Sequence, residues 1–517
     1  MTLAIADWVV LAGYLCIVLG IGIYFSRRNT NTEEYFVGGR RFRGWVIGLS
    51  LVGTSISSIT FLAYPADAFM TNWLRYLPNL ALLPAMLVAA FVFLPFFRRG
   101  NMTSAYEFLE LRYGPSIRVY GAVAFLVAQL VRLAMILWLL SLLIQQVTDL
   151  TPTTAIILGG LFVGLYTIIG GIDAVIWTDV LQTVILLLGG LICLWVILDA
   201  LPGGLNQVFE QAGHAGKFAL APWENGTPRD TSWSFSLSDK TATMMLLIGL
   251  TNWLTEYSSN QNTVQRYCAS RSTKEARRGL WVYLFTALPL WAFYMLLGTA
   301  LWVFFQVYPD PQASAILTGE ARAETLMPHF ITGYLPAGVA GLVIAAALAA
   351  AMSSLDSSIN SITTVSVVDL YRRHLRPGRD DRHYLKVAWG IAVAVTGVMI
   401  FGALWLNQAD TKTLQDTSTI LVSLLGGGML GLYLLGFFSK KGNARAAWAG
   451  IGFTLVFTSW TILTNNQLLP EALSAPFDLY YTGLIGNVLM FLVGYLVALF
   501  WPAASVAPVS PQPATEG

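Results

Sequence analysis

Charged residues are scarce in this sequence. Only 11% of its 517 residues are Asp, Glu, Lys or Arg, while 56% are hydrophobic. Soluble proteins carry roughly 25% charged residues, so this composition excludes a soluble globular protein and indicates a polytopic membrane protein. The net charge of +2 does not point to nucleic acid as a partner.

Histidine and cysteine are also rare. The four histidines lie outside the predicted membrane spans, and the three cysteines show no metal-binding or redox spacing. No pair of a nucleophile and a base is recognisable within the spans. These observations argue against a zinc-based or histidine-based intramembrane active site, and we expect that the protein is not an enzyme.

Long hydrophobic segments make up most of the sequence. Each of thirteen segments is long enough to cross a bilayer as a helix. They cover roughly residues 7–26, 44–68, 74–97, 118–147, 153–171, 174–199, 241–264, 279–307, 333–370, 385–407, 413–438, 444–464 and 479–501. The sequence therefore predicts an all-α membrane protein with about 13 transmembrane helices.

Positive residues gather in alternate loops. One set of loops contains 23 Lys and Arg residues, including Arg266, and the other contains 6. Because loops rich in Lys and Arg stay in the cytoplasm, we expect the N-terminus outside and the C-terminus inside the plasma (inner) membrane. Arg132 is the one basic residue left over, and it lies within a predicted span.

The spans divide into two sets of five. Because five is odd, the second set would run with inverted topology relative to the first. The predicted parts are an N-terminal span with a basic cytoplasmic loop (1–43), the first five-helix repeat (44–199), an extracellular loop (200–240), the second repeat (241–438), two C-terminal spans (439–501) and a disordered cytoplasmic tail (502–517).

The first span of each set is interrupted by polar residues. Residues 46–65 read VIGLSLVGTSISSITFLAYP, and Thr251 to Asn262 are similarly polar. Unsatisfied backbone is costly in hydrocarbon, so such stretches occur where protein or a cavity surrounds them. One alternative is a small-residue face for helix packing. Paired interruptions favour two discontinuous helices at a midplane binding site, with free carbonyls for an ion or solute.

A cluster of hydroxyl groups follows in the ninth span, AAMSSLDSSINSIT at 350–363. Ala350, Ser353, Ser354 and Ser357 share one helix face, and Asp356 borders that face. Hydroxyl, carboxylate and carbonyl oxygens suit a small hard cation. The alternative is that these hydroxyls bond only to their own helix.

Two further charges lie at membrane depth. Asp179 is about two turns from the cytoplasmic end of its span, either on an ion pathway or at the water interface. Arg132 is too deep to reach water easily and must meet an anion. That anion is a protein carboxylate (Glu256, Asp179 or Asp356) or the carboxylate of a substrate, which arginine can hold with two hydrogen bonds.

Several motifs resemble the sodium:solute symporter family. They are EYFVGGR at 34–40, GLSLVGTSISS at 48–58, YTIIGGIDAVIWTDVLQ at 166–182, NQNTVQRYCAS at 260–270 and AAAMSSLDSSINSITTVSVVDLY at 349–371. The resemblance extends from Asp7 to about Phe438. It implies the fold of inverted five-helix repeats with discontinuous first helices, and coupling of solute uptake to Na+.

The resemblance also implies particular site residues. The main sodium site would use the carbonyls of Gly53, Ile56 and Ala350 and the hydroxyls of Ser353 and Ser354. Within the family, the bacterial sialic acid transporters resemble this chain most. Their substrate site would fall on Ser55, Ser57, Thr60, Asn79 and Arg132, with Arg132 on the sugar carboxylate and Asn79 in place of an expected glutamine.

A second sodium site in those transporters maps to Asp179, Ser353 and Ser357. Asp356 stands where a serine is expected, and it would bind either sodium or a proton. The implied function is sodium-coupled uptake of a carboxylated sugar, N-acetylneuraminic acid, by alternating access, with one or two Na+ per sugar. The alternatives are a symporter for a neutral sugar or another small carboxylate, and a membrane sensor that does not transport. Partners are the substrate and membrane lipid, with no obligate protein partner implied.

Overall fold

The protein is a bundle of helices with one small hairpin. The computed structural model describes residues 3–99, 102–148, 150–224, 226–408, 427–439 and 442–501. The helices are α1 (Ile5–Ser26), α2 (Thr32–Val37), α3 (Gly44–Ser55), α4 (Ser58–Met70), α5 (Leu77–Leu80), α6 (Leu82–Val88), α7 (Leu94–Arg99), α8 (Glu107–Tyr113), α9 (Pro115–Val147), α10 (Pro152–Ala200), α11 (Gly204–His214), α12 (Ala242–Ser259), α13 (Gln261–Ala269), α14 (Thr273–Val307), α15 (Pro311–Thr318), α16 (Leu326–Tyr334), α17 (Val339–Val365), α18 (Asp381–Gln408), α20 (Met429–Phe438), α21 (Ala444–Asn465) and α22 (Thr482–Phe500). The hairpin pairs β1 (Trp223–Glu224) with β2 (Thr227–Pro228) in the predicted extracellular loop.

Helices of membrane-spanning length dominate the described residues. Nine of them are long and apolar enough to cross a bilayer, or ten when the bent pair α3–α4 counts as one span. The fifth and sixth predicted spans both lie in the 49-residue α10, which breaks at Gly171 (φ 58°, ψ −158°). The seventh corresponds to α12 and the polar α13. Most of the eleventh predicted span, 413–438, falls outside the described residues. Its described part contains α20. The predicted all-α membrane fold is confirmed.

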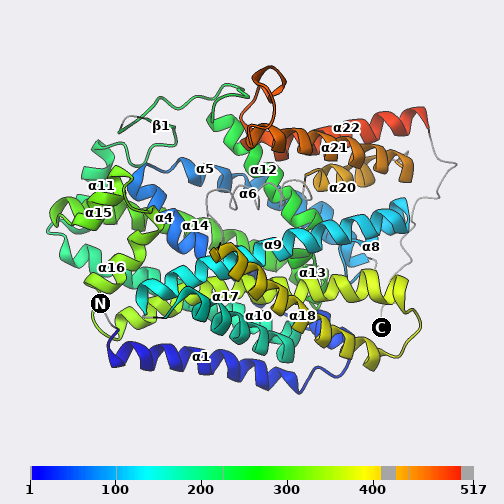
Figure 1. Ribbon diagram of the computed structural model, residues 1–517, viewed down its shortest axis with the longest axis horizontal. Coiled ribbons are helices and arrows are strands. Elements are labelled where there is room, and N and C mark those ends of the chain that lie inside the picture. The colour runs from blue at the N-terminus through cyan, green and yellow to red at the C-terminus, as the bar shows by residue number, and fades with distance from the viewer. Residues whose placement is uncertain are drawn as a thin grey trace.

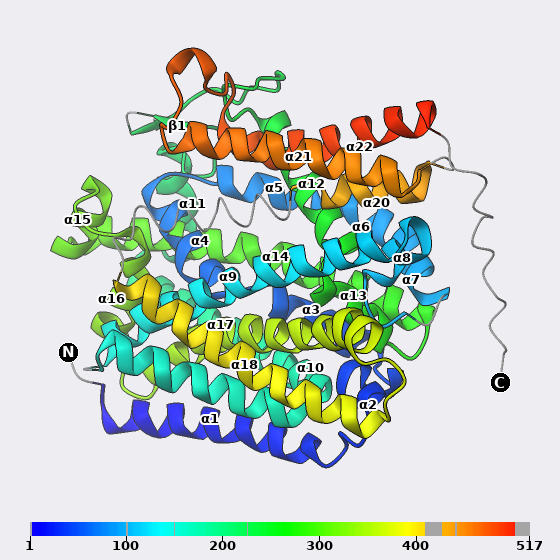
Figure 2. The ribbon, with the colours of Figure 1, turned by 45° about the vertical axis from the view of Figure 1, so that its right-hand side comes forward.

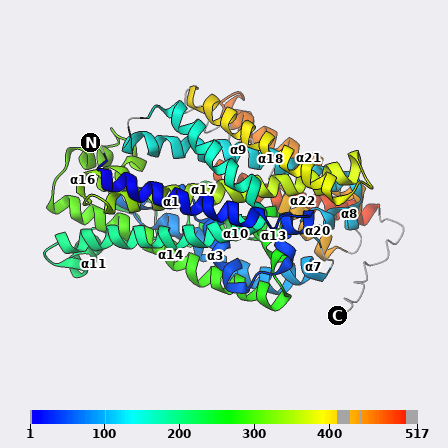
Figure 3. The same ribbon diagram turned by 90° about the horizontal axis from the view of Figure 1, so that it is seen from below.

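The long helices run roughly along the longest axis of the molecule (Figure 1). At one end lie α11, α15, α16 and the hairpin, and at the other end lies α8, joined by α2 and α7 in Figure 2. Seen from below, α1 lies across the bundle beside α10 and α17, which it contacts (Figure 3). The predicted extracellular and cytoplasmic loops are thus at opposite ends.

Packing between the two predicted repeats is reciprocal. The first helix pair of the first repeat, α3 and α4, packs on α14, the second helix of the second repeat. Likewise, α12 packs on α5 and α6, which belong to the second span of the first repeat. This exchange of partners is the arrangement expected of two inverted repeats. The two broken helices also meet directly, because α13 contacts α3.

One close approach fixes α4 against α14. A Cβ added at Gly298 of α14 would overlap the carbonyl oxygen of Pro65 in α4, so only glycine fits there. By contrast, Gly390 of α18 has open space around its Cβ position.

We expect Gly298→Ala to lower the thermal stability of the purified protein by about 1–3 kcal/mol, because the added methyl overpacks the α4–α14 contact. Gly390→Ala is the matched control, since it adds the same methyl to a helix without the overlap and improves helix propensity. Equal melting temperatures for the two variants in detergent would contradict the close approach.

Candidate functional site

Two helices are interrupted at the centre of the bundle. α3 ends at Ser55 and α4 begins at Ser58, with a bend of 59° between the halves. Ile56, between them, has extended backbone angles (φ −94°, ψ 99°). Asn260, between α12 and α13, is extended in the same way (φ −81°, ψ 119°). Backbone at both breaks therefore leaves the regular helical ladder, as the polar interruptions predict.

The first break contacts the hydroxyl cluster of α17. The Ser353 hydroxyl donates to the Gly53 carbonyl at 2.8 Å and to the Ala350 carbonyl of its own helix at 3.2 Å. The Ser354 hydroxyl donates to the Thr54 carbonyl at 3.5 Å. The structure thus joins Gly53, Ala350 and Ser353 directly.

These atoms suit a sodium ion. Ile56 is fully buried at the break itself, and Ser353 and Ser354 are each 1% exposed. Carbonyl and hydroxyl oxygens shielded from water are the ligands that a small hard cation prefers. The predicted main sodium site of Gly53, Ile56, Ala350, Ser353 and Ser354 is therefore chemically reasonable, and its ligand roles stay a prediction.

The predicted sugar-binding residues lie around the same break. Ser55 ends α3, Ser57 lies in the break and Thr60 lies in the first turn of α4. Asn79 of α5 donates its Nδ2 to the Tyr64 hydroxyl of α4 at 2.8 Å. α9, which carries Arg132, packs against α4. Their convergence on one ligand stays a prediction.

Arg132 is half-buried in the middle of α9. Within the described part of the chain, no residue forms an ion pair or hydrogen bond with its guanidinium. Glu256 instead accepts hydrogen bonds from Asn260 Nδ2 and Thr263 Oγ1, both at 2.7 Å. The structural ion pair between Arg132 and Glu256, which the sequence left open, is not formed.

Asp179 does have a cationic partner, and it is Arg266. The Arg266 guanidinium is 2.7 Å from Asp179 Oδ2 and donates to Ser357 Oγ at 2.7 Å. It also donates to Ser50 Oγ at 2.8 Å and to the Asn262 carbonyl at 2.7 Å. One fully buried arginine of α13 therefore links α3, α10 and α17.

The assignment of Arg266 to a cytoplasmic loop is wrong. The residue lies in α13 and is 1% exposed. α13 is polar because protein surrounds it on all sides, so hydropathy does not mark it as part of the bundle. Asn262, Gln265 and Arg266 share one face at i, i+3 and i+4, and this spacing was the signal that could have identified them.

The other three residues of the predicted second sodium site lie on α17. Ser353 already bonds to the first break, and Ser357 accepts from Arg266 and lies 3.2 Å from the Thr54 hydroxyl. Asp356 Oδ2 accepts from the Tyr166 hydroxyl at 2.7 Å and from Thr178 Oγ1 at 3.3 Å. The structure brings Asp179 and Ser357 together through Arg266, while Asp356 faces α10.

Contacts of α13 hold together the predicted cytoplasmic side of the bundle. Gln265 Nε2 donates to Asn360 Oδ1 at 2.7 Å and to the Phe36 carbonyl at 2.6 Å. Arg40 and Arg98 both donate to the Cys268 carbonyl near the end of α13. These cations complement the negative end of the helix dipole.

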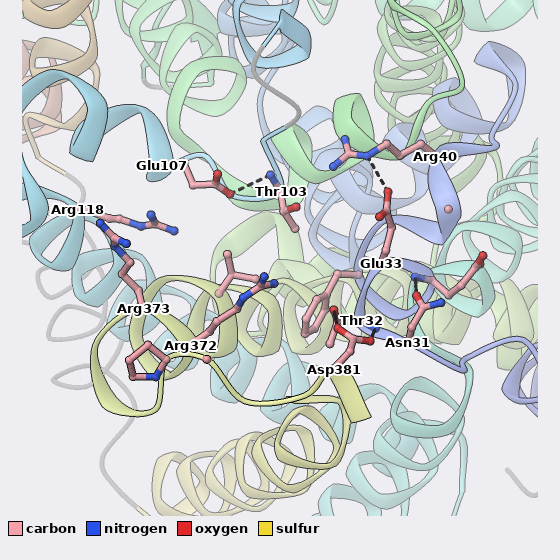
Figure 4. A pocket seen from close by; sticks show the side chains of 16 residues that line it. Asn31, Thr32, Glu33, Arg40, Thr103, Glu107, Arg118, Arg372, Arg373 and Asp381 are labelled. Carbon is pink, nitrogen blue, oxygen red and sulfur yellow. Dashed lines mark hydrogen bonds and ion pairs between the residues drawn. The ribbon is translucent and has the colours of Figure 1, made fainter. Parts of the chain in front are cut away.

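A polar cavity of about 900 Å³ is lined by residues of α2, α8 and the segment after α17, at the predicted cytoplasmic end (Figure 4). Its walls carry an ion pair between Arg40 and Glu33 and hydrogen bonds from Thr32 to Asp381. Four acidic and four basic side chains line it, so their charges balance and do not mark a selective anion site.

On the opposite side, the loop after α11 is tied to the end of α4. The Lys217 amine donates to the Phe69 carbonyl at 2.8 Å and lies against the rings of Trp223 and Trp302. Asn72 Nδ2 donates to the Ala221 carbonyl at 2.8 Å. Burial lowers the pKa of the Lys217 amine to about 8. These two hydrogen bonds therefore hold the loop against the end of α4.

The arrangement is that of a membrane transporter built around two discontinuous helices, with carbonyl and hydroxyl oxygens gathered at one break. The chain belongs to the sodium:solute symporter family, which matches residues 35–452. Na+ is accordingly its coupling ion.

Known proteins similar over the full length support this family assignment. The chain is 32% identical over 505 residues to the sodium/sialic acid symporter SiaT of Proteus mirabilis (strain HI4320), covering 97% of this chain and 96% of that protein. It is 29% identical over 494 residues to the sodium/sialic acid symporter NanT of Aliivibrio fischeri (strain ATCC 700601 / ES114), covering 95% and 92%. A solved Na+-coupled sialic acid symporter in a substrate-bound outward-open state superposes with a TM-score of 0.88 at 30% identity, covering 98% of this chain and 100% of that chain.

Proposed function

We propose that this protein takes up a carboxylated sugar, N-acetylneuraminic acid, together with sodium by alternating access. Arg132 carries the proposal, because it is a half-buried cation without a partner among the described residues. Such a group is costly to leave unpaired inside a membrane and is completed by a substrate carboxylate. The similarity to two sialic acid symporters agrees with this substrate.

Ser55, Ser57, Thr60 and Asn79 would bind the remaining polar groups of the sugar. Ser55, Ser57 and Thr60 lie at the break between α3 and α4, and Asn79 of α5 bonds to Tyr64 of α4. Sodium bound to Gly53, Ile56, Ala350, Ser353 and Ser354 would join this break to α17 and stabilise the outward-open state. Uptake of the sugar would then depend on an ion that the break itself holds.

The direction of the chain in the inner membrane follows from its charges. Arg40, Arg98 and Arg112 lie at the end of the bundle that carries α2, α7 and α8 (Figure 2). By the positive-inside rule this end faces the cytoplasm, which puts the N-terminus outside and the C-terminus inside. The proposed role requires transfer of solute and ions only, so the protein is not an enzyme.

Uptake of labelled N-acetylneuraminic acid into proteoliposomes tests the proposal. We expect accumulation above the external concentration with an inward sodium gradient and none when potassium replaces sodium, because sodium is the coupling ion. Accumulation of a neutral sugar or small carboxylate in its place would reject the substrate. Binding of the sugar without any accumulation would favour a sensor.

A further inference from the structure

One buried tyrosine of α14 has a hydroxyl group that the fold does not use. Tyr283 is fully buried, and no described residue meets its hydroxyl in hydrogen-bonding geometry. Tyr294, on the same helix, shows the usual arrangement, because its buried hydroxyl donates to the Leu186 carbonyl at 2.9 Å. Buried polar groups in native proteins almost always have a partner, so the exception at Tyr283 needs an explanation.

The hydroxyl of Tyr283 lies close to the first break. Its neighbours include the hydroxyls of Ser55, the last residue of α3, and of Tyr257 in α12. The rings of Tyr257 and Tyr283 meet edge to face, with 6.1 Å between their centroids. Ser55 is half-buried, whereas Tyr283 has no exposed surface. A ligand at the break therefore touches Ser55 and reaches Tyr283 only through it.

Packing between α3 and α14 holds Tyr283 in place. The two helices lie against each other (Figure 3). They approach so closely that a Cβ added at Gly48 of α3 would overlap the side chain of Val282, the residue before Tyr283. The tyrosine ring is thus fixed, while the hydroxyl of Ser55 is free to turn about its own bonds. A hydrogen bond between the two residues depends on how Ser55 is oriented.

We propose that Tyr283 is a positioning residue for the sugar and acts through Ser55. When the sugar binds, the Tyr283 hydroxyl donates to Ser55 Oγ, and Ser55 turns its own proton toward the ligand. A serine hydroxyl has one proton and two acceptor lone pairs, so it accepts from Tyr283 and donates to the sugar at once. Ser55 then selects an acceptor oxygen on the sugar. The inference rests on the proposed function, because it takes Ser55 as a sugar ligand.

This role has opposite effects on stability and on binding. Without sugar, an unpaired buried hydroxyl destabilises the fold, so its removal leaves the protein as stable as wild type or more stable. With sugar, its removal frees Ser55 to turn away from the ligand and weakens binding. A hydroxyl that serves only the fold behaves in the reverse way, since its removal lowers stability and leaves the affinity for sugar unchanged.

Tyr283→Phe tests the inference, because it removes the hydroxyl and keeps the ring. We expect the purified, sugar-free variant to melt at or above the wild-type temperature in detergent. Its affinity for N-acetylneuraminic acid in saturating sodium, measured by calorimetry, should fall about 5-fold, which is the effect of one neutral hydrogen bond. Tyr294→Phe is the matched control. It removes a bonded hydroxyl from the same helix, so it should melt at a lower temperature and bind the sugar like wild type.

A double substitution shows whether Tyr283 acts through Ser55. Ser55→Ala should weaken sugar binding about 10-fold, because it removes the group that touches the ligand. Adding Tyr283→Phe to Ser55→Ala should weaken binding no further, since the two residues form one unit. A further 5-fold loss in the double variant would overturn the inference, and so would an unchanged affinity in Tyr283→Phe alone.

Melting temperatures separate this inference from the choice of sugar. If Tyr283→Phe melts below wild type without sugar, its hydroxyl already serves the fold, and the inference is overturned whichever sugar binds. If wild type does not bind N-acetylneuraminic acid, the proposed substrate is rejected. The same comparison of affinities, made with the solute that the uptake assay accepts, then decides the role of Tyr283.

Discussion

Arg132→Ala should reduce sodium-driven uptake of N-acetylneuraminic acid more than 100-fold and leave sodium binding without sugar unchanged. A guanidinium holds a carboxylate through two charge-assisted hydrogen bonds, each worth about 1.5–3 kcal/mol. Losing both weakens binding by at least about 3 kcal/mol, or roughly 100-fold. The proposed main sodium site involves α3 and α17 rather than α9, so sodium binding should not change.

Arg132→Lys separates charge from geometry in this test. Lysine keeps the positive charge but cannot make the paired contact, so uptake should fall to an intermediate level. The methyl ester of the sugar provides the complementary control, because it lacks the carboxylate. It should be a poor substrate for wild type and should lose little more in Arg132→Ala. Unchanged uptake of the free acid by Arg132→Ala would remove Arg132 from the site.

The fold could be predicted from the sequence because membrane-spanning helices have recognisable sequence patterns. Hydrophobic length marks most of the spans, and polar residues within two of them mark the breaks at Ile56 and Asn260. The sequence also identified Arg132 as a candidate binding residue, because a charge in the middle of a hydrophobic helix needs a functional or structural reason. It left the partner of Arg132 open, since contacts between helices far apart in the chain are not local properties.

The same limit explains why the sequence wrongly assigned Arg266 to a loop. Hydropathy measures contact with lipid, and α13 contacts protein instead, so its polar residues resembled a loop. The partner of Arg266, Asp179, is 87 residues away in the sequence. Periodicity places a residue on a helix face but does not say which helix covers it.

Arg266→Met should destabilise the protein by about 3–5 kcal/mol and abolish sodium-driven uptake. Arg266 is 1% exposed and pairs with the fully buried Asp179 at 2.7 Å. Removing the cation leaves a carboxylate uncompensated in a dry interior, which is the most costly way to break a buried ion pair. The change should appear as a large drop in melting temperature in detergent. A melting temperature like that of wild type would show that the pair does not stabilise the fold.

A double substitution distinguishes the two roles of this ion pair. Replacing a whole buried pair by apolar residues is often neutral, so Arg266→Met with Asp179→Leu should recover much of the lost stability. Transport should not recover, because Arg266 also joins α13 to Ser50 and Ser357, and Asp179 is a proposed sodium ligand. Arg266→Lys is the control that keeps the charge and loses most of these bonds, so it should fold better than Arg266→Met and transport poorly. If the double variant were as unstable as Arg266→Met, the loss would come from the bonds of Arg266 to α3 and α17 rather than from an unpaired Asp179. If it transported like wild type, neither residue would take part in coupling sodium to transport.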